Sequence, residues 1–465
     1  MIHRIVITTA ISSVLLIAQI PDFRPPTPLF GAVLRNDTQA VKEVLASGVS
    51  PNEGRFFGNP PMVLAIMNGN QSAVQAMLEH GADPKLLDRH GSSMLMWAAG
   101  GERPSSAVVD LLLKRGADPN VQNTLGETAL TWAMRRGDMK IVEQLKAAGA
   151  SDSQAVRQSV ERAVALLQKS SPEFIKVSGC TSCHHQSLPQ MLYSVARSRG
   201  YKVDDDAAAK DIKALLAMVK PMREGLENGK VNLPNPGISI SYTLLGMEAE
   251  SYAPDEYTAA LAKAVVRTQA PDGHFAILPA RPPLEASPFT STALSIRALQ
   301  VYGQNNAEQI ARGVQWLIAA KPNTQEERTM KLLGLNWGAA DRSEIDRAAA
   351  ELIAQQQADG GWAQLNGLES DAYATGQAMV ALYQAAALKP TDSAYQRGAA
   401  FLLRTQMPDG SWLVRTRSSP VQALKDSGFP HGRHQWISAA GTSWAAMALA
   451  YSQPKATVHE SGGMF

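Results

Sequence analysis

The chain has 465 residues, of which 45% are hydrophobic and 18% are charged. This length exceeds what a single hydrophobic core usually serves, so we expect two or three folded domains. The 44 basic and 42 acidic residues give a formal charge of only +2, which provides no basic field for nucleic acid. The composition therefore excludes a nucleic-acid partner from the expected functions.

The first twenty residues have the pattern of an export signal. His3 and Arg4 give a polar, basic start, and the stretch from Ile5 to Ile20 contains no charged residue. This stretch is short for a membrane span and is interrupted by Ser and Thr. We expect residues 1–20 to be a signal peptide or an uncleaved N-terminal anchor, which would then be the membrane contact. Either alternative predicts a periplasmic or secreted protein.

Four glycines between residues 28 and 152 mark an internal repeat, and each follows a helical stripe of apolar residues. They lie 33 to 35 residues apart, at Gly48, Gly81, Gly116 and Gly149. The pattern resembles the ankyrin repeat, whose helix-start motif is degenerate here. The resemblance implies about four repeats over residues 28–152, with each glycine in a left-handed turn. It also implies contact with a protein partner, or alternatively a packing wall for the rest of the chain.

A second repeated signature, Gln-x-x-Asp-Gly-x-aromatic, follows in the remaining sequence. Its three copies run from Gln269 to Phe275, from Gln356 to Trp362 and from Gln406 to Trp412. The signature resembles the Gln-Trp motif of squalene–hopene cyclases and protein prenyltransferases. That resemblance implies an (α/α)6 toroid over residues 155–453. It further implies that the Gln caps a neighbouring helix, that Asp-Gly forms the turn, and that the aromatic ring stacks on the Gln.

The sequence contains six candidate inner helices, the number that closes such a ring. They are 185–197, 238–250, 289–302, 327–335, 372–384 and 437–451. Closure would make the first and last of these helices neighbours, with their amino ends on the same side. Residues 454–465 are expected to form a disordered tail. The predicted fold is therefore all-α, an ankyrin solenoid followed by an (α/α)6 toroid.

The acidic motif of class II terpene cyclases is incomplete. These enzymes donate a proton from an Asp-x-Asp-Asp run, but the best match here keeps only Asp371 and has Tyr373 in the place of the donor. A phenol is far too weak an acid for that step. The other acidic cluster, residues 204–206, is expected to cap a helix. Terpene cyclisation is therefore not expected, and the sequence leaves open whether the protein is an enzyme.

The two cysteines form a Cys-x-x-Cys-His motif made of Cys180, Cys183 and His184, with His185 directly after it. This is the attachment sequence of c-type haem, in which two thiols bind the porphyrin and the His ligates iron. Export fits, because such haem is attached outside the cytoplasm. Two alternatives remain open, a disulfide between the thiols and a zinc site that uses the cysteines with one or two histidines.

A second group of polar residues precedes the last inner helix. If the ring closes, His431 or His434 would lie near the cysteine motif as a distal haem ligand or a further metal ligand, and Arg433 would balance haem propionates. Local hydrogen bonding of these histidines is the alternative.

The preferred hypothesis is an extracytoplasmic redox or sensor protein with covalent haem at the rim of the ring and ankyrin repeats for protein contact. A metal-dependent enzyme or binder of an apolar, isoprenoid-like ligand in the toroid cavity is the second hypothesis. A structural interaction protein with a Cys180–Cys183 disulfide is the third.

Overall fold

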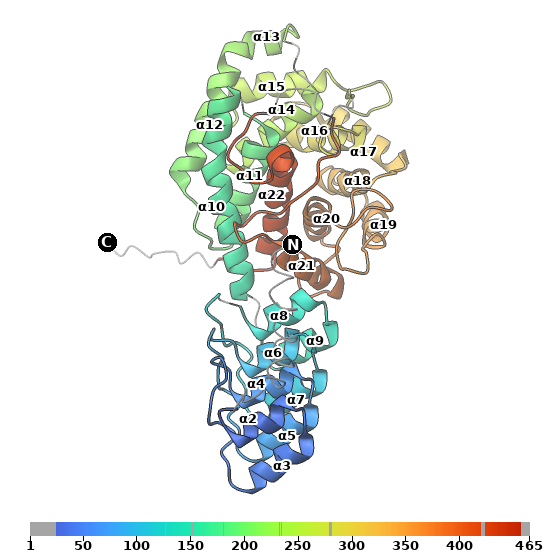
Figure 1. Cartoon of the computed structure of the whole chain (residues 1–465). Helices are drawn as coiled ribbons and strands as arrows, with labels where there is room; N and C mark the ends of the chain where they lie inside the picture. Colours follow the sequence, from blue (N-terminus) through green and yellow to red (C-terminus); the bar gives the residue numbers. More distant parts are fainter. Residues whose placement is uncertain are drawn as a thin grey trace, which may run out of the picture. The chain divides into compact units, whose positions relative to one another are not determined.

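The computed structural model describes residues 25–125, 127–150, 153–179, 181–231, 233, 235–278, 281–419 and 424–456. The expected export signal, Cys180 and residues 457–465 of the expected tail lie outside the described residues. The chain divides into two compact units, Met1–Ala155 and Val156–Phe465. Both are built from helices, and the described ranges contain only isolated β-bridges (Figure 1). The all-α prediction is therefore confirmed.

None of the helices in the described ranges combines the length and the apolar character that a bilayer crossing requires.

The first unit consists of four helix pairs. The pairs are α2 (Pro28–Leu34) with α3 (Thr38–Ala46), α4 (Pro61–Met67) with α5 (Gln71–Glu79), α6 (Met94–Gly100) with α7 (Ser106–Lys114), and α8 (Ala129–Arg136) with α9 (Met139–Ala147). Within each pair the two helices pack together, and each helix also packs on its counterpart in the next pair. This stacking is the ankyrin arrangement, in which each repeat contacts only its neighbours.

The repeat glycines have the conformation that the sequence predicts. Gly48, Gly81, Gly116 and Gly149 have φ between +81° and +88°, the left-handed region that favours glycine. The loops then join successive repeats. The side-chain amide of Asn52 donates to the carbonyl of Gly81 at 3.0 Å. Two repeats later, the side-chain amide of Asn120 donates to the carbonyl of Gly149, also at 3.0 Å. The same short motif therefore forms the turn and ties it to the next repeat.

The inner layer of the second unit is a closed ring of six helices. It consists of α11 (Leu188–Ser198), α14 (Pro236–Ala249), α16 (Pro288–Tyr302), α18 (Gln325–Trp337), α20 (Ala372–Gln384) and α22 (Gln435–Tyr451). Each of these helices packs against the next, and α22 packs back against α11. All six lie close to their predicted ranges, and the expected closure is present (Figure 1).

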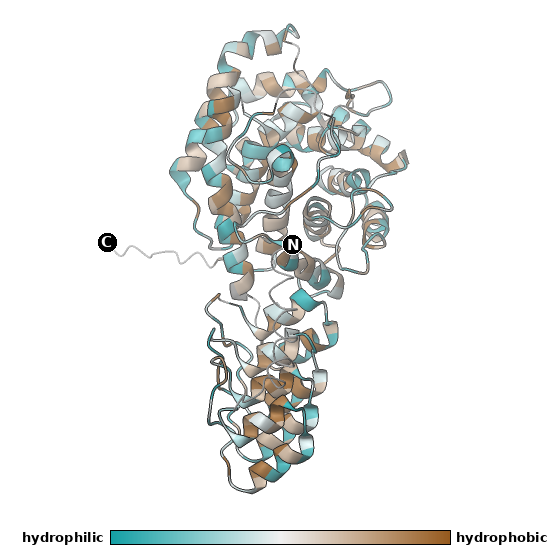
Figure 2. Cartoon of the chain, viewed as in Figure 1, coloured by the Kyte–Doolittle hydropathy of each residue, from teal (hydrophilic) through white to brown (hydrophobic). Residues whose placement is uncertain are grey.

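An outer layer surrounds this ring. It contains α10 (Ser153–Ser178), α12 (Asp205–Val219), α13 (Arg223–Glu227), α15 (Glu256–Val266), α17 (Ala307–Ala319), α19 (Arg342–Ile353) and α21 (Ser393–Thr405). Outer helices such as α21 have one polar, exposed face. The inner helix α22 is instead buried along almost its whole length, and most of its residues are small or carry a hydroxyl group. Figure 2 accordingly shows α20 and α22 in pale colours of intermediate hydropathy. Small side chains allow the six inner helices to approach one another closely.

The repeated glutamines staple the outer layer. The Nε2 atom of Gln356 donates to the carbonyl of Gly360 in its own turn and to that of Ala394 at the start of α21, both at 2.8 Å. Gln269 makes the equivalent pair of bonds, to Gly273 and Gln309. In the two copies that end in Trp, the aromatic residue forms a bond of its own, since the indole N–H of Trp362 donates to a carbonyl of the preceding helix at 2.9 Å and that of Trp412 does so at 2.8 Å.

The third signature closes the ring. The Nε2 atom of Gln406 donates to the carbonyl of Gly410 at 3.0 Å and to that of Ser159, on α10, at 2.9 Å. Residues that are 247 positions apart in the sequence are thereby joined. The identical spacing of the three signatures is thus explained by the same pair of hydrogen bonds from the Gln side chain. This pair occurs twice between successive outer helices and once between the two ends of the ring.

Candidate functional site

The cysteine motif lies at the amino end of the first inner helix. Cys183–Ser187 forms a single π-helical turn that leads into α11, and the Ser182 hydroxyl caps it by accepting from the backbone N–H of His185 at 3.1 Å. The turn packs against α14 and α22 as well as α11. It therefore sits where the two ends of the ring meet, at one mouth of the ring. Cys180 lies outside the described residues.

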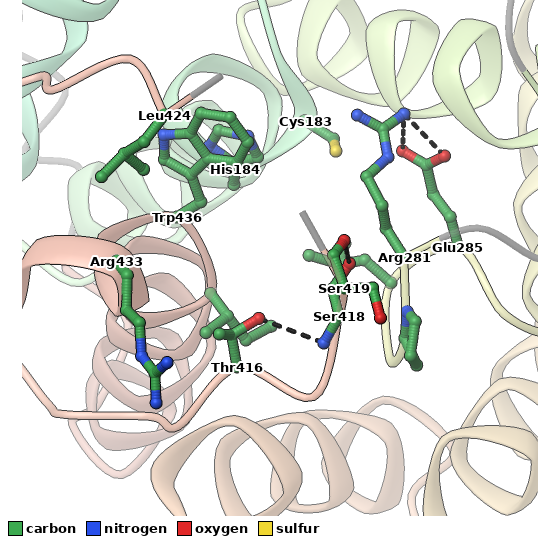
Figure 3. Close-up of a pocket in the computed structure, with 13 residues that line it drawn as sticks. Cys183, His184, Arg281, Glu285, Thr416, Ser418, Ser419, Leu424, Arg433 and Trp436 are labelled. Atoms are coloured by element: carbon green, nitrogen blue, oxygen red, sulfur yellow. Dashed lines mark hydrogen bonds and ion pairs between the residues drawn. The ribbon is translucent and has the colours of Figure 1, made fainter. Parts of the chain in front are cut away.

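A cavity of about 260 Å³ opens at this mouth. Cys183, His184 and Arg433 are among the residues that line it. The rest of the wall exposes mainly apolar surface to the cavity. It comes from loops and from the start of α22, namely Arg281, Pro282, Leu284, Glu285, Thr416, Ser418, Ser419, Leu424, Trp436 and Ile437. Figure 3 shows the sulfur of Cys183 and the ring of His184 on one side of this space, with Arg281 and Arg433 approaching from opposite sides.

The charges at the wall act on the thiol. Arg281 forms an ion pair with Glu285 at 2.8 Å, and Glu285 also accepts a hydrogen bond from the side chain of Asn235 at 2.9 Å. Burial raises the pKa of the Cys183 thiol to about 12, and the negative charge of Glu285 adds to this shift. The thiol is therefore neutral at physiological pH.

The two histidines are packed among aromatic rings. His184 stacks on Trp436 with ring centroids 5.4 Å apart, and His185 stacks on Phe174 at 4.6 Å. Burial lowers the pKa of both rings, for His185 to about 3. Both imidazoles are therefore neutral near pH 7, which is the form that ligates metal ions.

The polar segment before α22 is only partly at the cavity. Arg433 lines it, but His431 and His434 do not. The Nε2 atom of His431 lies 2.8 Å from the Ser411 hydroxyl, and the Nδ1 atom of His434 accepts from the backbone N–H of Thr416 at 3.1 Å. These contacts correspond to the local hydrogen bonding that was the alternative for both residues.

No group of three or more His, Cys, Asp or Glu side chains suited to hold a metal ion occurs among the residues that the structure describes. Cys183 also forms no disulfide with any of the described residues. Both findings leave out Cys180, the second thiol of the motif.

A buried acidic cluster inside the ring was not expected from the sequence. Glu326, on α18, is 4% exposed. Its carboxyl group accepts from the Tyr373 hydroxyl at 3.0 Å and from the Thr290 hydroxyl at 3.1 Å. Burial raises the pKa of Glu326 to about 7. The fully buried hydroxyl of Tyr242 is electrostatically coupled to this carboxyl and has no hydrogen-bond partner among the described residues.

The members of this cluster come from different inner helices, Tyr242 from α14, Glu326 from α18 and Tyr373 from α20. Only the spatial arrangement of α14, α18 and α20 brings the cluster together. The one sequence signal available was a Glu one residue before the predicted start of the fourth inner helix, a position that capping alone would explain.

The acidic residues that the sequence singled out act as helix caps. The side chain of Asp371 accepts from the backbone N–H of Ala374 at 3.0 Å, and that of Asp204 accepts from Ala207 at 3.0 Å. Asp371 also accepts from Gln364 at 2.9 Å, and burial raises its pKa to about 6. The capping role predicted for the cluster at 204–206 is thus observed for Asp204.

Comparisons with known proteins identify the repeats of the first unit. Family models described as ankyrin repeats match residues 29–123 and 104–145. Two proteins from Bos taurus are similar over short segments, an inactive serine/threonine-protein kinase (34% identical over 85 residues, 18% of this chain) and cyclin-dependent kinase 4 inhibitor B (37% over 60 residues, 13% of this chain). These matches confirm the ankyrin repeats that the sequence predicted for this part of the chain.

A third relative is drimenyl diphosphate synthase of Streptomyces showdoensis, which is 29% identical over 192 residues, or 37% of this chain. The matched segments cover only 6%, 34% and 45% of the kinase, the synthase and the inhibitor, respectively. The similarity to a terpenoid synthase is consistent with the closed ring of helix pairs. The chain therefore contains ankyrin repeats and a toroid of the kind that the sequence signatures predicted.

Proposed function

We propose that the protein is an extracytoplasmic haem protein, with a c-type haem attached at the mouth of the ring and with the ankyrin repeats as its contact to a protein partner. The observation that carries this proposal is that the thiol of Cys183 and the imidazole of His184 line one open cavity between two arginines. Thiol, imidazole and guanidinium groups are the partners that the vinyl groups, the iron and the propionates of a haem require.

The residues present fit this group chemically. Cys180 and Cys183 would each add S–H across a vinyl double bond, which forms a thioether and releases no other product. The apolar wall would shield the porphyrin face, and His184 would ligate the iron. Bound haem would supply one-electron redox chemistry and binding of small diatomic ligands. Arg281 is already paired with Glu285, so Arg433 is the more available partner for a propionate.

The arrangement favours sensing over electron transfer. His431 and His434 were the candidates for the distal ligand, but their ring nitrogens bond to Ser411 and Thr416 outside the cavity wall. We therefore expect that neither histidine would ligate the iron and that bound haem would accept an exogenous ligand. Carbon monoxide should shift the absorption spectrum of the reduced protein, and His431→Ala and His434→Ala should leave that spectrum unchanged. A parent protein that does not respond to carbon monoxide would instead indicate a distal side chain.

The attachment itself can be tested in cells that export the protein together with a haem-maturation system. We expect a red protein whose Soret band survives denaturation, and loss of this covalent colour in Cys180→Ala and Cys183→Ala. Thr181→Val, which changes the residue between them without touching a thiol, is the matched control and should stay red. Zinc without iron by elemental analysis would support a metal site instead. A metal-free chain two mass units below the reduced mass would support the disulfide.

A second candidate function is an enzyme or binder that admits an apolar, isoprenoid-like ligand to the ring. It is favoured by the protonatable Glu326 beside Tyr373, by the Tyr242 hydroxyl, which has no hydrogen-bond partner among the described residues, and by the similarity to drimenyl diphosphate synthase. Incubation with farnesyl diphosphate, followed by mass spectrometry of the products, tests it. Turnover that disappears in Glu326→Gln would support this function, and unchanged substrate with the parent protein would refute it for this ligand.

A further inference from the structure

The rings of His184 and His185 are hydrogen bonded to each other through like atoms. Their Nδ1 atoms lie 2.5 Å apart. A hydrogen bond between two such nitrogens requires that one carries a proton and that the other is bare. The groups bonded to the far side of each ring decide which is which.

The first chain of bonds starts at Gln435. Its Oε1 atom accepts from the backbone N–H of Ser427 at 2.8 Å, and its Nε2 atom donates to the carbonyl of Gly432 at 3.1 Å, so the orientation of the amide is fixed. The Ser427 hydroxyl lies 2.8 Å from the same Oε1 and must donate its only proton there. It can then only accept from the Nε2 atom of His185, at 2.8 Å.

This polarity continues to the cavity. A neutral His185 that carries its proton on Nε2 has a bare Nδ1, and so the Nδ1 atom of His184 must be the donor. No acidic side chain among the described residues hydrogen bonds to either ring, and His185 is 1% exposed, so neither ring has a partner that would favour a charged form.

A second chain of bonds leads to the same assignment independently. The Oε1 atom of Gln186 accepts from the backbone N–H of Ser182 at 2.7 Å and from its hydroxyl at 3.2 Å, while the Nε2 atom of Gln186 donates to the carbonyl of Ser171 at 3.1 Å. The Ser182 hydroxyl has thereby used its proton. Its contact with the Nδ1 atom of His184, at 3.3 Å, is then one in which the imidazole donates.

From these two chains we propose that His185, Ser427 and Gln435 form a positioning relay that holds His184, a residue of the cavity wall, in the Nδ1–H tautomer and so leaves its Nε2 atom bare. The role of this atom as an iron ligand rests on the proposed function, whereas the tautomer does not. A metal-ligating imidazole needs this form, and the bond at its second nitrogen fixes the ring and raises its basicity. Because the relay joins the turn before α11 to the segment before α22, it exists only in the closed ring.

The tautomer can be read directly from the full-length protein produced without haem maturation. Histidines labelled with nitrogen-15 distinguish protonated from bare ring nitrogens by NMR, and His184→Gln assigns the signal. We expect a bare Nε2 and a protonated Nδ1 at His184, in roughly tenfold excess over the other tautomer because two acceptors converge on Nδ1. A protonated Nε2 at His184 would overturn the relay.

The variant Ser427→Ala combined with Ser182→Ala removes both anchors and should reduce this excess about tenfold. Ser418→Ala is the matched control, because this hydroxyl lines the same cavity but lies outside the relay, and it should leave the ratio unchanged. An unchanged ratio in the double variant, with native circular dichroism, would also count against the relay.

The two proposals fail in different ways. A protein that becomes red on maturation but has Nε2–H at His184 beforehand would refute the relay and keep the haem. A protein that stays colourless with Nδ1–H at His184 would keep the relay and refute the haem.

Discussion

The two units use the same turn conformation under different constraints. Gly116 in the ankyrin array has φ +81°, and a Cβ atom placed there would meet no atom of the described residues within 4 Å. Gly410 in the ring has φ +92°, but a Cβ atom there would lie 2.7 Å from the backbone of Arg162. Backbone conformation alone selects glycine at the repeat turns of the array, whereas conformation and close packing both select it at the signature turns of the ring.

The difference follows from topology. Each ankyrin repeat contacts only the repeats before and after it, so its turns face solvent. In the ring the turns of the Gln-x-x-Asp-Gly-x-aromatic signatures are pressed against the next outer helix, and the last of them is pressed against α10, the first helix of the ring's outer layer. A local change should therefore cost little stability in the array and much more in the ring, and substitutions in both units test this.

The largest effect is expected for Gly410→Ala. The left-handed conformation costs an alanine about 1 kcal/mol, and the clash with Arg162 adds overpacking, for a total loss of about 4 kcal/mol in the stability of the ring. Gly116→Ala should cost the array only about 1 kcal/mol. Gly367→Ala is the control within the ring, since this glycine has φ +82° and open space around it. Denaturant unfolding measures all three, and equal losses for Gly410 and Gly367 would contradict the packing argument.

The buried acid should make the stability of the ring depend on pH. The pKa of Glu326 is raised in the folded protein to about 7 from its ordinary value of 4.5, so the folded state retains a proton that the unfolded state has lost. Its contribution to stability should therefore fall by about 3 kcal/mol as the pH rises from about 4.5 to about 7. Glu326→Gln should remove this fall.

The comparison must be made between parent and variant across this range, because the lowered pKa values of His184 and His185 act in the opposite direction in both proteins. Scanning calorimetry at several pH values provides the measurement. Parallel pH profiles for parent and variant would show that the Glu326 carboxyl is ionised in the fold.

Removal of the closing staple is expected to have the next largest effect. Gln406→Ala deletes the bonds to Ser159 and Gly410, at a cost of about 2 kcal/mol. Gln356→Ala deletes two equivalent bonds between successive helices and should cost the same if the ring is closed in solution. A much smaller loss for Gln406→Ala in urea titrations would show that the junction between the two ends is open.

The smallest effect is expected in the array. Asn52→Ala removes the bonds to the carbonyl of Gly81 and the N–H of Asp83, but both are solvent-exposed, so we expect a loss of about 1 kcal/mol. Gln39→Ala, which removes only a surface bond within one helix, should be nearly neutral. A loss at Asn52 as large as that at Gln406 in the same titration would erase the proposed distinction between array and ring.

The repeats could be predicted because each leaves a periodic trace in the sequence. Turn glycines 33 to 35 residues apart specified the array, and three Gln-x-x-Asp-Gly-x-aromatic signatures specified the ring. The site was predicted only in part. Cys183, His184 and Arg433 line one cavity because the ring closes, as its six inner helices implied.

The remainder depends on contacts that no local pattern encodes. Arg281, Glu285 and Ser427 belong to irregular segments whose paths are set by tertiary packing. Glu326 meets Tyr373 only across two inner helices. The prediction that His431 or His434 would lie at the cysteine motif was the least well founded, because neither side chain lines the cavity. The backbone at His431 is left-handed, with φ +85°, and the rings of His431 and His434 form hydrogen bonds with Ser411 and Thr416.

The bond between Gln406 and Ser159 joins residues 247 positions apart, and such a long separation affects the order in which the chain can fold. A growing chain can complete each ankyrin pair as soon as it has been synthesised, because all its partners lie nearby in sequence. The helices of the ring have no such option, since α11 lacks its neighbour until α22 has been made. Until then the inner faces of these helices are exposed and can aggregate or misfold. The packing of α22, close to the end of the fold, ends this exposure.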